Sequence, residues 1–228
     1  MDPSPLRAKI LETIVRKSSL KQQVFDNTFA TFNELKDILF EMSSEWDDEL
    51  DGRIDRRVRI EYRDRGKFEA QLQVANDILI FQMHTDVFEF EPNHVIWQNP
   101  YVQTDRDNSY CGVINIYNFL SDSFKFNRNA DEGYLIGRIF INRERRYFAE
   151  GKQQNSMRAM DFGKSEIGQE ALVAILESAI GFALNFDLLM PPYEENKRVT
   201  VDQFNTKMDN SKFVTGKRLD YDFDVEDI

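Results

Sequence analysis

The sequence RVRIEYRDRGKFEAQLQVANDILIFQMHTDVFEF, residues 57–90, decides the fold class because its apolar and polar residues alternate. A period of two is typical of β-strands with one buried face and one solvated face. Polar turns at 64–66 and 75–77 separate the apolar runs, and they are too short for helical crossovers. The pattern therefore predicts consecutive antiparallel strands in a meander.

We expect an antiparallel sheet of about six to eight strands between residues 57 and 150. Residues 98–108 contain Pro100 and several Asp and Asn residues, which is typical of a loop. The predicted strands are 57–63, 68–74, 78–84, 87–91, 94–97, 110–120, 134–142 and 145–150.

Helices are predicted on both sides of the sheet region. In residues 5–45, apolar residues recur at three- and four-residue steps, and Ser18 and Ser19 favour a break between two helices because Ser19 can act as an N-cap. Residues 165–189, capped by Ser165, are apolar on nearly all sides, which predicts a buried helix on the sheet face opposite the arginines. The predicted fold class is α+β: an N-terminal helical pair, an antiparallel meander and a long buried helix packed on it.

Composition and charge indicate a globular chain of 228 residues, 41% hydrophobic, with a formal net charge of −11. We expect a single α+β domain over residues 1–190 and a polar, partly flexible C-terminal extension over 191–228. The acidic balance disfavours nucleic acid and anionic lipid as partners. A single cysteine, no signal peptide and no membrane span favour a cytoplasmic location, and the oligomeric state stays open.

No motif predicts a cofactor. The tripeptide Gly163-Lys164-Ser165 matches the end of a phosphate-binding loop, but Arg158 stands where that loop needs its first glycine. We therefore expect no nucleotide or other cofactor.

Residues 47–55 resemble part of an EF-hand calcium loop, in which alternating carboxylates converge on one cation and glycine permits a sharp turn. Gly52 stands at loop position six, but position twelve is Val58 in place of the bidentate glutamate, and a predicted strand follows. We favour an acidic helix end that runs into a polar turn, and we treat the carboxylates as weak metal candidates. These candidates are Asp47, Glu49, Asp51 and Asp55.

Arginines of the first predicted strand and the turn after it form a candidate ligand- or partner-binding face. Their guanidinium groups suit carboxylates or phosphates. The alternative, which we favour, is that Glu61 and Glu69 neutralise them on a solvated face. The candidate residues are Arg57, Arg59, Arg63 and Arg65.

The two histidines, His84 and His94, can in principle form a metal site with nearby acids, although structural roles are more common for such residues. A nucleophilic pair of Cys111 with either histidine can be drawn, but sequence separation carries no geometry. The nearby acids are Asp86, Glu89 and Glu91.

Residues 219–228 alternate apolar and acidic side chains, so an extended conformation has one hydrophobic side and one anionic side. Such a segment suits docking on a sheet edge or in a basic groove. It predicts a protein partner bound through this acidic tail, with Tyr221, Phe223 and Ile228 as the contact residues. The alternatives are a last strand of the same sheet or a solubilising tail.

Together these patterns favour a non-enzymatic protein-interaction or ligand-sensing module, because no catalytic signature accompanies the segregated charges. The alternative is a metal-dependent hydrolase that uses Asp and Glu ligands. A nucleic-acid binder ranks third, since the clustered arginines are few.

Overall fold

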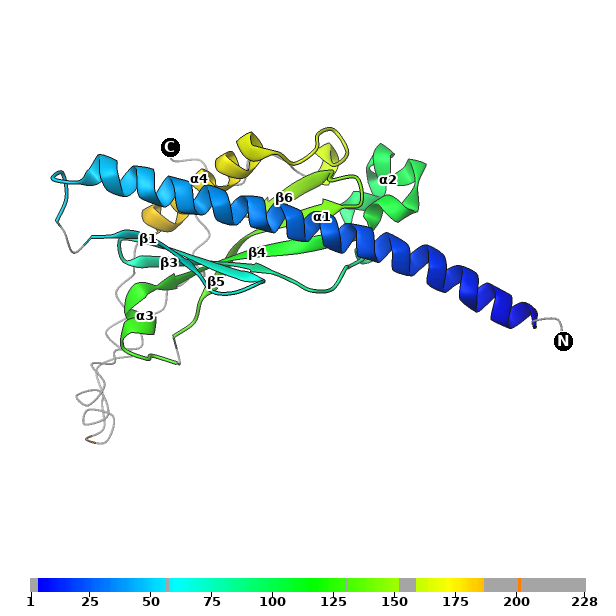
Figure 1. The fold of residues 1–228 in the computed structure, drawn as a ribbon, viewed down its shortest axis with the longest axis horizontal. Coiled ribbons are helices and arrows are strands. Elements are labelled where there is room, and N and C mark those ends of the chain that lie inside the picture. Colours follow the sequence, from blue (N-terminus) through cyan, green and yellow to red (C-terminus); the bar gives the residue numbers. More distant parts are fainter. Residues whose placement is uncertain (1–3, 56–57, 130, 152–158, 187–200, 202–228) are drawn as a thin grey trace.

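The computed structural model describes residues 4–55, 58–129, 131–151, 159–186 and 201 (Figure 1). The α-helices are α1 (Pro5–Leu50), α2 (Pro100–Thr104), α3 (Ser121–Lys125) and α4 (Gln169–Asn185). The strands are β1 (Ile60–Asp64), β2 (Glu69–Val74), β3 (Asp77–Met83), β4 (Cys111–Leu120), β5 (Tyr134–Asn142) and β6 (Tyr147–Gly151). Three short 3-10 helices are η1 (Val95–Gln98), η2 (Arg106–Ser109) and η3 (Ala159–Asp161).

The strands of the described residues form a six-stranded sheet in chain order, each antiparallel to the next. A tight turn joins β2 to β3: Val74 pairs with Asp77, and Ala75 has a positive φ of 53°. The α+β class and the antiparallel meander predicted from the alternating sequence are therefore confirmed.

Two of the predicted strands are wrong. Residues 87–91 form only an isolated bridge with the first residue of β4, and residues 94–97 enter the helical turn η1. The cause is local, because the His94 Nδ1 atom accepts a hydrogen bond from the backbone N–H of Ile96 at 3.2 Å and so caps that turn. Residues 98–108, predicted as a loop, contain the short helices α2 and η2.

The predicted N-terminal helical pair is a single helix. α1 runs through 46 residues, a length of about 69 Å, and Ser18 and Ser19 lie exposed in its interior. Leu20 and Val24 are buried against Tyr110 directly after the serines, so tertiary contacts hold the helix where a break was predicted. Neither α1 nor any other helix of the described residues is both long and apolar enough to cross a membrane.

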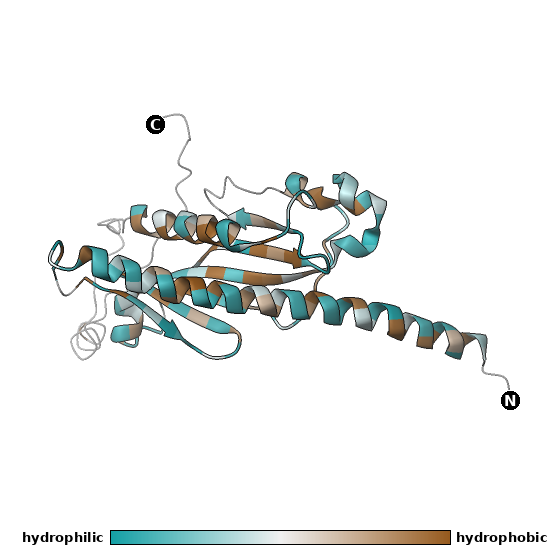
Figure 2. Ribbon diagram, turned by 45° about the horizontal axis from the view of Figure 1, so that its top comes forward, coloured by the Kyte–Doolittle hydropathy of each residue, from teal (hydrophilic) through white to brown (hydrophobic). Residues whose placement is uncertain are grey.

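The main core lies between one face of the sheet and the two long helices, α1 and α4 (Figure 2). α4 is the predicted buried helix, but it begins after Gly168 and not at Ser165, because a bridge between Glu166 and Arg146 holds the preceding residues extended. Burial of each large apolar side chain stabilises the fold by about 1.5–3 kcal/mol. The largest fully buried side chains of this core are Phe32, Leu35, Leu39, Leu72, Leu79, Phe81, Ile114, Ile116 and Ile139.

A second core covers the opposite face at one end of the sheet. Phe140 and Phe148 stack there with ring centroids 4.7 Å apart, under side chains from η1, α2 and η3. The buried Asn99 side chain connects these short helices, because its Nδ2 atom donates to the carbonyls of Ala159 and Phe162, each at 3.0 Å. The sheet is thus covered on both faces at this end.

One buried amide in the main core lacks a partner. The Oδ1 and Nδ2 atoms of Asn118 make no hydrogen bond within the described part of the chain, although the residue is only 1% exposed. A buried unpaired polar group costs about 1–3 kcal/mol. We expect Asn118→Leu to raise the free energy of unfolding by about 1 kcal/mol in urea denaturation, and a loss of stability would contradict this assignment.

Candidate functional site

The most distinctive surface is the N-terminal end of α1, which extends past the ends of the strands and beyond α2 (Figure 1). Every helical residue from 5 to 19 is exposed, and Leu20 is the first buried one. This projecting end is about 22 Å long. Its five large apolar side chains are between 49% and 68% exposed, namely Leu6, Ile10, Leu11, Ile14 and Val15.

These apolar side chains form two neighbouring rows along the helix, because residues four apart lie on the same side of an α-helix. The first row is Leu6, Ile10 and Ile14, and the second contains Leu11 and Val15. A contiguous exposed apolar strip of this kind is typical of a binding surface.

Residues 5–21, which we call the projecting segment, are also basic. They hold five basic residues against one acidic residue, a net charge of +4 in a chain of −11, so the remainder of the chain carries −15. A third row with the same four-residue spacing contains Lys9, Lys17 and Lys21 and runs beside the first apolar row. The segment therefore presents apolar and cationic groups side by side.

Contacts with η2 and with Tyr110, just before β4, fix the direction in which the projecting segment leaves the fold. The Lys17 ammonium lies 5.7 Å from the centre of the Tyr110 ring, and a hydrogen bond with Tyr110 raises the pKa of Lys17. Arg16 lies 3.8 Å from a carboxylate oxygen of Asp107. The C-terminal end of the projecting segment is thus held against the rest of the fold by these contacts.

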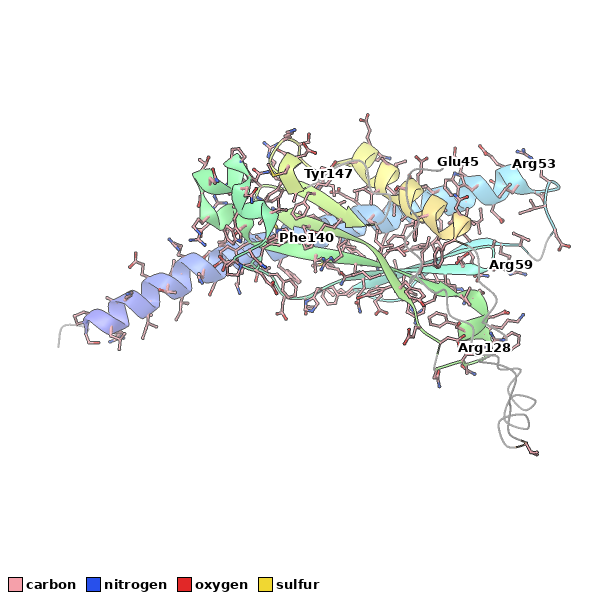
Figure 3. All side chains as sticks on the ribbon, turned by 180° about the vertical axis from the view of Figure 1, so that it is seen from behind. Glu45, Arg53, Arg59, Arg128, Phe140 and Tyr147 are labelled. Atoms are coloured by element: carbon pink, nitrogen blue, oxygen red, sulfur yellow. The ribbon has the colours of Figure 1, made fainter. Side chains whose placement is uncertain are left out.

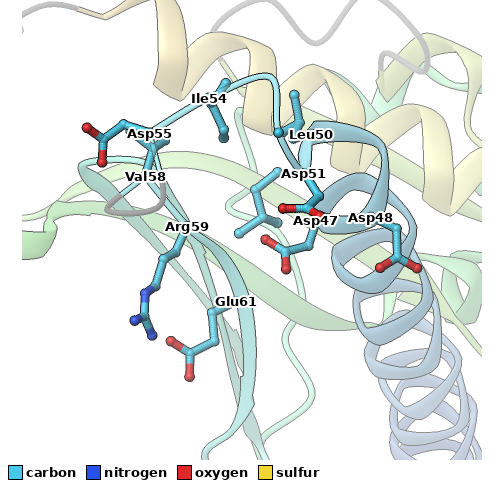
Figure 4. Close-up of a pocket in the computed structure, with 11 residues that line it drawn as sticks. Asp47, Asp48, Leu50, Asp51, Ile54, Asp55, Val58, Arg59 and Glu61 are labelled. Atoms are coloured by element: carbon cyan, nitrogen blue, oxygen red, sulfur yellow. The ribbon is translucent and has the colours of Figure 1, made fainter.

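A groove of about 410 Å³ lies at the other end of α1, between the helix end and β1 (Figure 4). Arg59 lies at this end of the molecule, far from the N-terminus (Figure 3). Among the described residues that line it, the charged ones are mainly acidic. Its charged lining residues are Asp47, Asp48, Asp51, Asp55, Arg59 and Glu61.

The calcium-loop candidates border this groove but do not converge. Figure 4 shows Asp55 across the loop from Asp47, with its carboxylate directed away from the helix end. Within the described residues, no group of three or more His, Cys, Asp or Glu side chains is placed to hold a metal ion. Glu49 is exposed and does not line the groove, and Val58 does. The metal-dependent hydrolase stays a prediction without geometric support.

Two arginines of the predicted face, Arg63 and Arg65, form ion pairs. Arg63 donates to both carboxylate oxygens of Glu61 at 3.1 Å, and this hydrogen bonding lowers the pKa of Glu61. Arg65 donates to Gln71 at 3.0 Å and lies 3.8 Å from Glu69. These contacts agree with the favoured alternative of neutralised arginines, although the Arg63 pair lies within one strand.

The histidines have structural contacts. His94 caps η1 and lies 3.3 Å from Glu150, and the Nδ1 atom of His84 accepts a hydrogen bond from the Asp86 backbone at 3.0 Å. Burial raises the pKa of the Cys111 thiol far above its usual range, which keeps the sulfur protonated and unreactive. A Cys–His nucleophile is therefore disfavoured.

Some predicted site residues lie outside the described residues, namely Arg57, Tyr221, Phe223 and Ile228. The projecting segment could not be distinguished from sequence, because its apolar residues have the same spacing as those of the buried part of α1. The basic residues among them were an available signal. Comparison with models of protein families, with curated proteins and with solved structures returned no match.

Proposed function

We propose that this protein is a non-enzymatic interaction protein and that the projecting segment, residues 5–21 of α1, binds its partner. The observation that carries the proposal is the double row of exposed apolar side chains on the part of α1 that precedes its first buried residue, Leu20. Helices of about 12–15 residues are marginal in water without packing, so a partner that covers these rows also stabilises the segment. The single cysteine and the acidic charge suit a cytoplasmic setting.

The mode of recognition is an apolar helix face with charges beside it, a common arrangement for helix-based binding. Apolar contacts supply most of the affinity, and the lysine row supplies orientation and faster association with an acidic partner. The segment continues a helix that is already packed on the sheet, so it needs no separate helix nucleation, which lowers the ordering cost of binding.

Affinity capture from the protein's own cells, quantified by mass spectrometry, tests the proposal. We expect the full-length double variant Ile10→Ser/Ile14→Ser to lose its specific partners by at least about tenfold, since each buried anchor contributes about 1–2 kcal/mol. Both side chains are exposed, so the variant should keep the wild-type free energy of unfolding.

The matched control is Phe40→Ser, which removes an exposed apolar side chain from the anchored part of the same helix. It should retain every partner. Retention of all partners by the double variant, or an equal loss in the control, would refute the proposal.

A further inference from the structure

Within each row of the projecting segment, the spacing between side chains is close to that of an extended peptide whose apolar and acidic residues alternate. Residues four apart in a helix are separated by about 6 Å along the axis. Successive side chains on one side of an extended strand are about 6.7 Å apart. An extended peptide with apolar side chains on one side and carboxylates on the other can therefore lie parallel to the helix axis, with its apolar side chains near the apolar row and its carboxylates near the lysine row.

Charge distinguishes between the possible occupants of this surface. A second copy of the projecting segment brings another net charge of +4 and is repelled. An anionic membrane attracts the segment but repels the remainder of the chain, which carries −15. An acidic polypeptide with regularly spaced apolar side chains is attracted by the basic segment, and its apolar side chains can cover the apolar rows.

This chain contains such a polypeptide in residues 219–228. The ten residues have five acidic side chains and no basic one. Their apolar members alternate with aspartates at the spacing of a strand. These members are Leu219, Tyr221, Phe223 and Val225.

We propose that residues 219–228 bind the projecting segment of their own chain. The apolar side chains cover the row of Leu6, Ile10 and Ile14, and the aspartates face the lysine row. The 32 intervening residues, 187–218, can span about 105 Å when extended. This span exceeds the length of α1, which is about 69 Å. The acidic segment therefore reaches the surface from the end of α4.

The inference rests on the proposed function because both assign binding to the same surface, and it adds regulation. A bound tail covers the apolar rows until an external partner displaces it. Displacement is favoured by raised ionic strength, which weakens the attraction between aspartates and lysines.

Paramagnetic labelling of the full-length chain tests the inference. The native cysteine is buried, so a cysteine introduced by Lys217→Cys accepts a nitroxide label selectively. The label should cause loss of the NMR signals of Leu6, Ile10 and Ile14. The triple variant Lys9→Glu/Lys17→Glu/Lys21→Glu should recover them, whereas the control Arg53→Glu, at the opposite end of the molecule (Figure 3), should not.

Unchanged signals in the labelled chain would overturn the inference. Signal loss that appears only between labelled and unlabelled copies in a mixture would overturn the assignment to the same chain. Signal loss that persists in the triple variant would overturn the role of the basic residues. The Ile10→Ser/Ile14→Ser capture experiment decides the proposed function separately, because it measures external partners.

Discussion

Replacement of Gly112 by valine will lower the free energy of unfolding by about 3 kcal/mol or more. Gly112 lies on β4 directly under α1, where an added Cβ atom would approach the Oγ1 atom of Thr28 to 2.2 Å and its Cβ atom to 2.9 Å. Thr28 is fully buried and donates to the carbonyl of Val24, so it cannot move aside without breaking that bond. Urea denaturation followed by circular dichroism measures the loss.

Gly181 provides the matched control for Gly112. It lies inside α4, and apart from the adjacent backbone of α4 no atom of the described residues lies within 4 Å of an added Cβ atom. Gly181→Ala should therefore raise the free energy of unfolding by up to about 1 kcal/mol through helix propensity. Gly112→Val with wild-type stability would mean that α1 does not pack on β4 at this point.

Replacement of Asn142 by leucine will cost about 3 kcal/mol. The Asn142 Nδ2 atom donates to the Tyr101 hydroxyl at 2.8 Å and to the Asn108 carbonyl at 3.3 Å. Its Oδ1 atom accepts from the backbone N–H groups of Glu144 at 2.9 Å and Arg146 at 3.0 Å. Leucine removes all four hydrogen bonds from partners that are buried or partly buried, and each buried polar group left unpaired costs about 1–3 kcal/mol. The same denaturation experiment measures the effect.

Asn118→Leu is the internal comparison for Asn142→Leu. Both residues are buried asparagines on adjacent strands, but only Asn142 has hydrogen-bond partners. We therefore expect opposite signs from the same chemical change. Equal effects of the two substitutions would show that the polar contacts around Asn142 do not stabilise the β5–β6 turn.

The sheet was predictable from sequence because apolar and polar residues alternate in its first strands, β1 and β2, and short polar turns separate the strands. β5 has the predicted bounds, Tyr134–Asn142, and β4 differs by one residue at its start. Of the two wrong strands, 87–91 precedes the helical turn η1 and 94–97 overlaps it, and the N-cap of this turn is His94. A histidine cap is a weak signal in a sequence, so alternation alone favoured a strand there.

The continuity of α1 was not predictable because helix propensities are small. Serine costs only about 0.5 kcal/mol in a helix interior, and the contacts of Leu20 and Val24 with Tyr110 exceed that cost. Tyr110 is distant in the sequence, so no residue near Ser18 or Ser19 indicates that Leu20 and Val24 pack against it.

The projecting segment was hidden for a related reason. Leu6, Ile10 and Ile14 have the same four-residue spacing as Leu20 and Val24, so the sequence does not reveal where the sheet under the helix ends. Only the fold shows that the first three side chains have no neighbouring strand within the described residues. The lysines beside them were visible in the sequence, but they acquire meaning only once the helix is seen to project.

The most direct test of the binding surface is site-specific photo-cross-linking of the full-length protein in its own cells. A photoreactive amino acid replaces Ile14 in one sample and Phe40, an exposed residue of the anchored helix, in another. We predict a discrete product from position 14, joined either to a partner protein or to residues 219–228, and no such product from position 40. Absence of a product at position 14, or identical products from both positions, would contradict it.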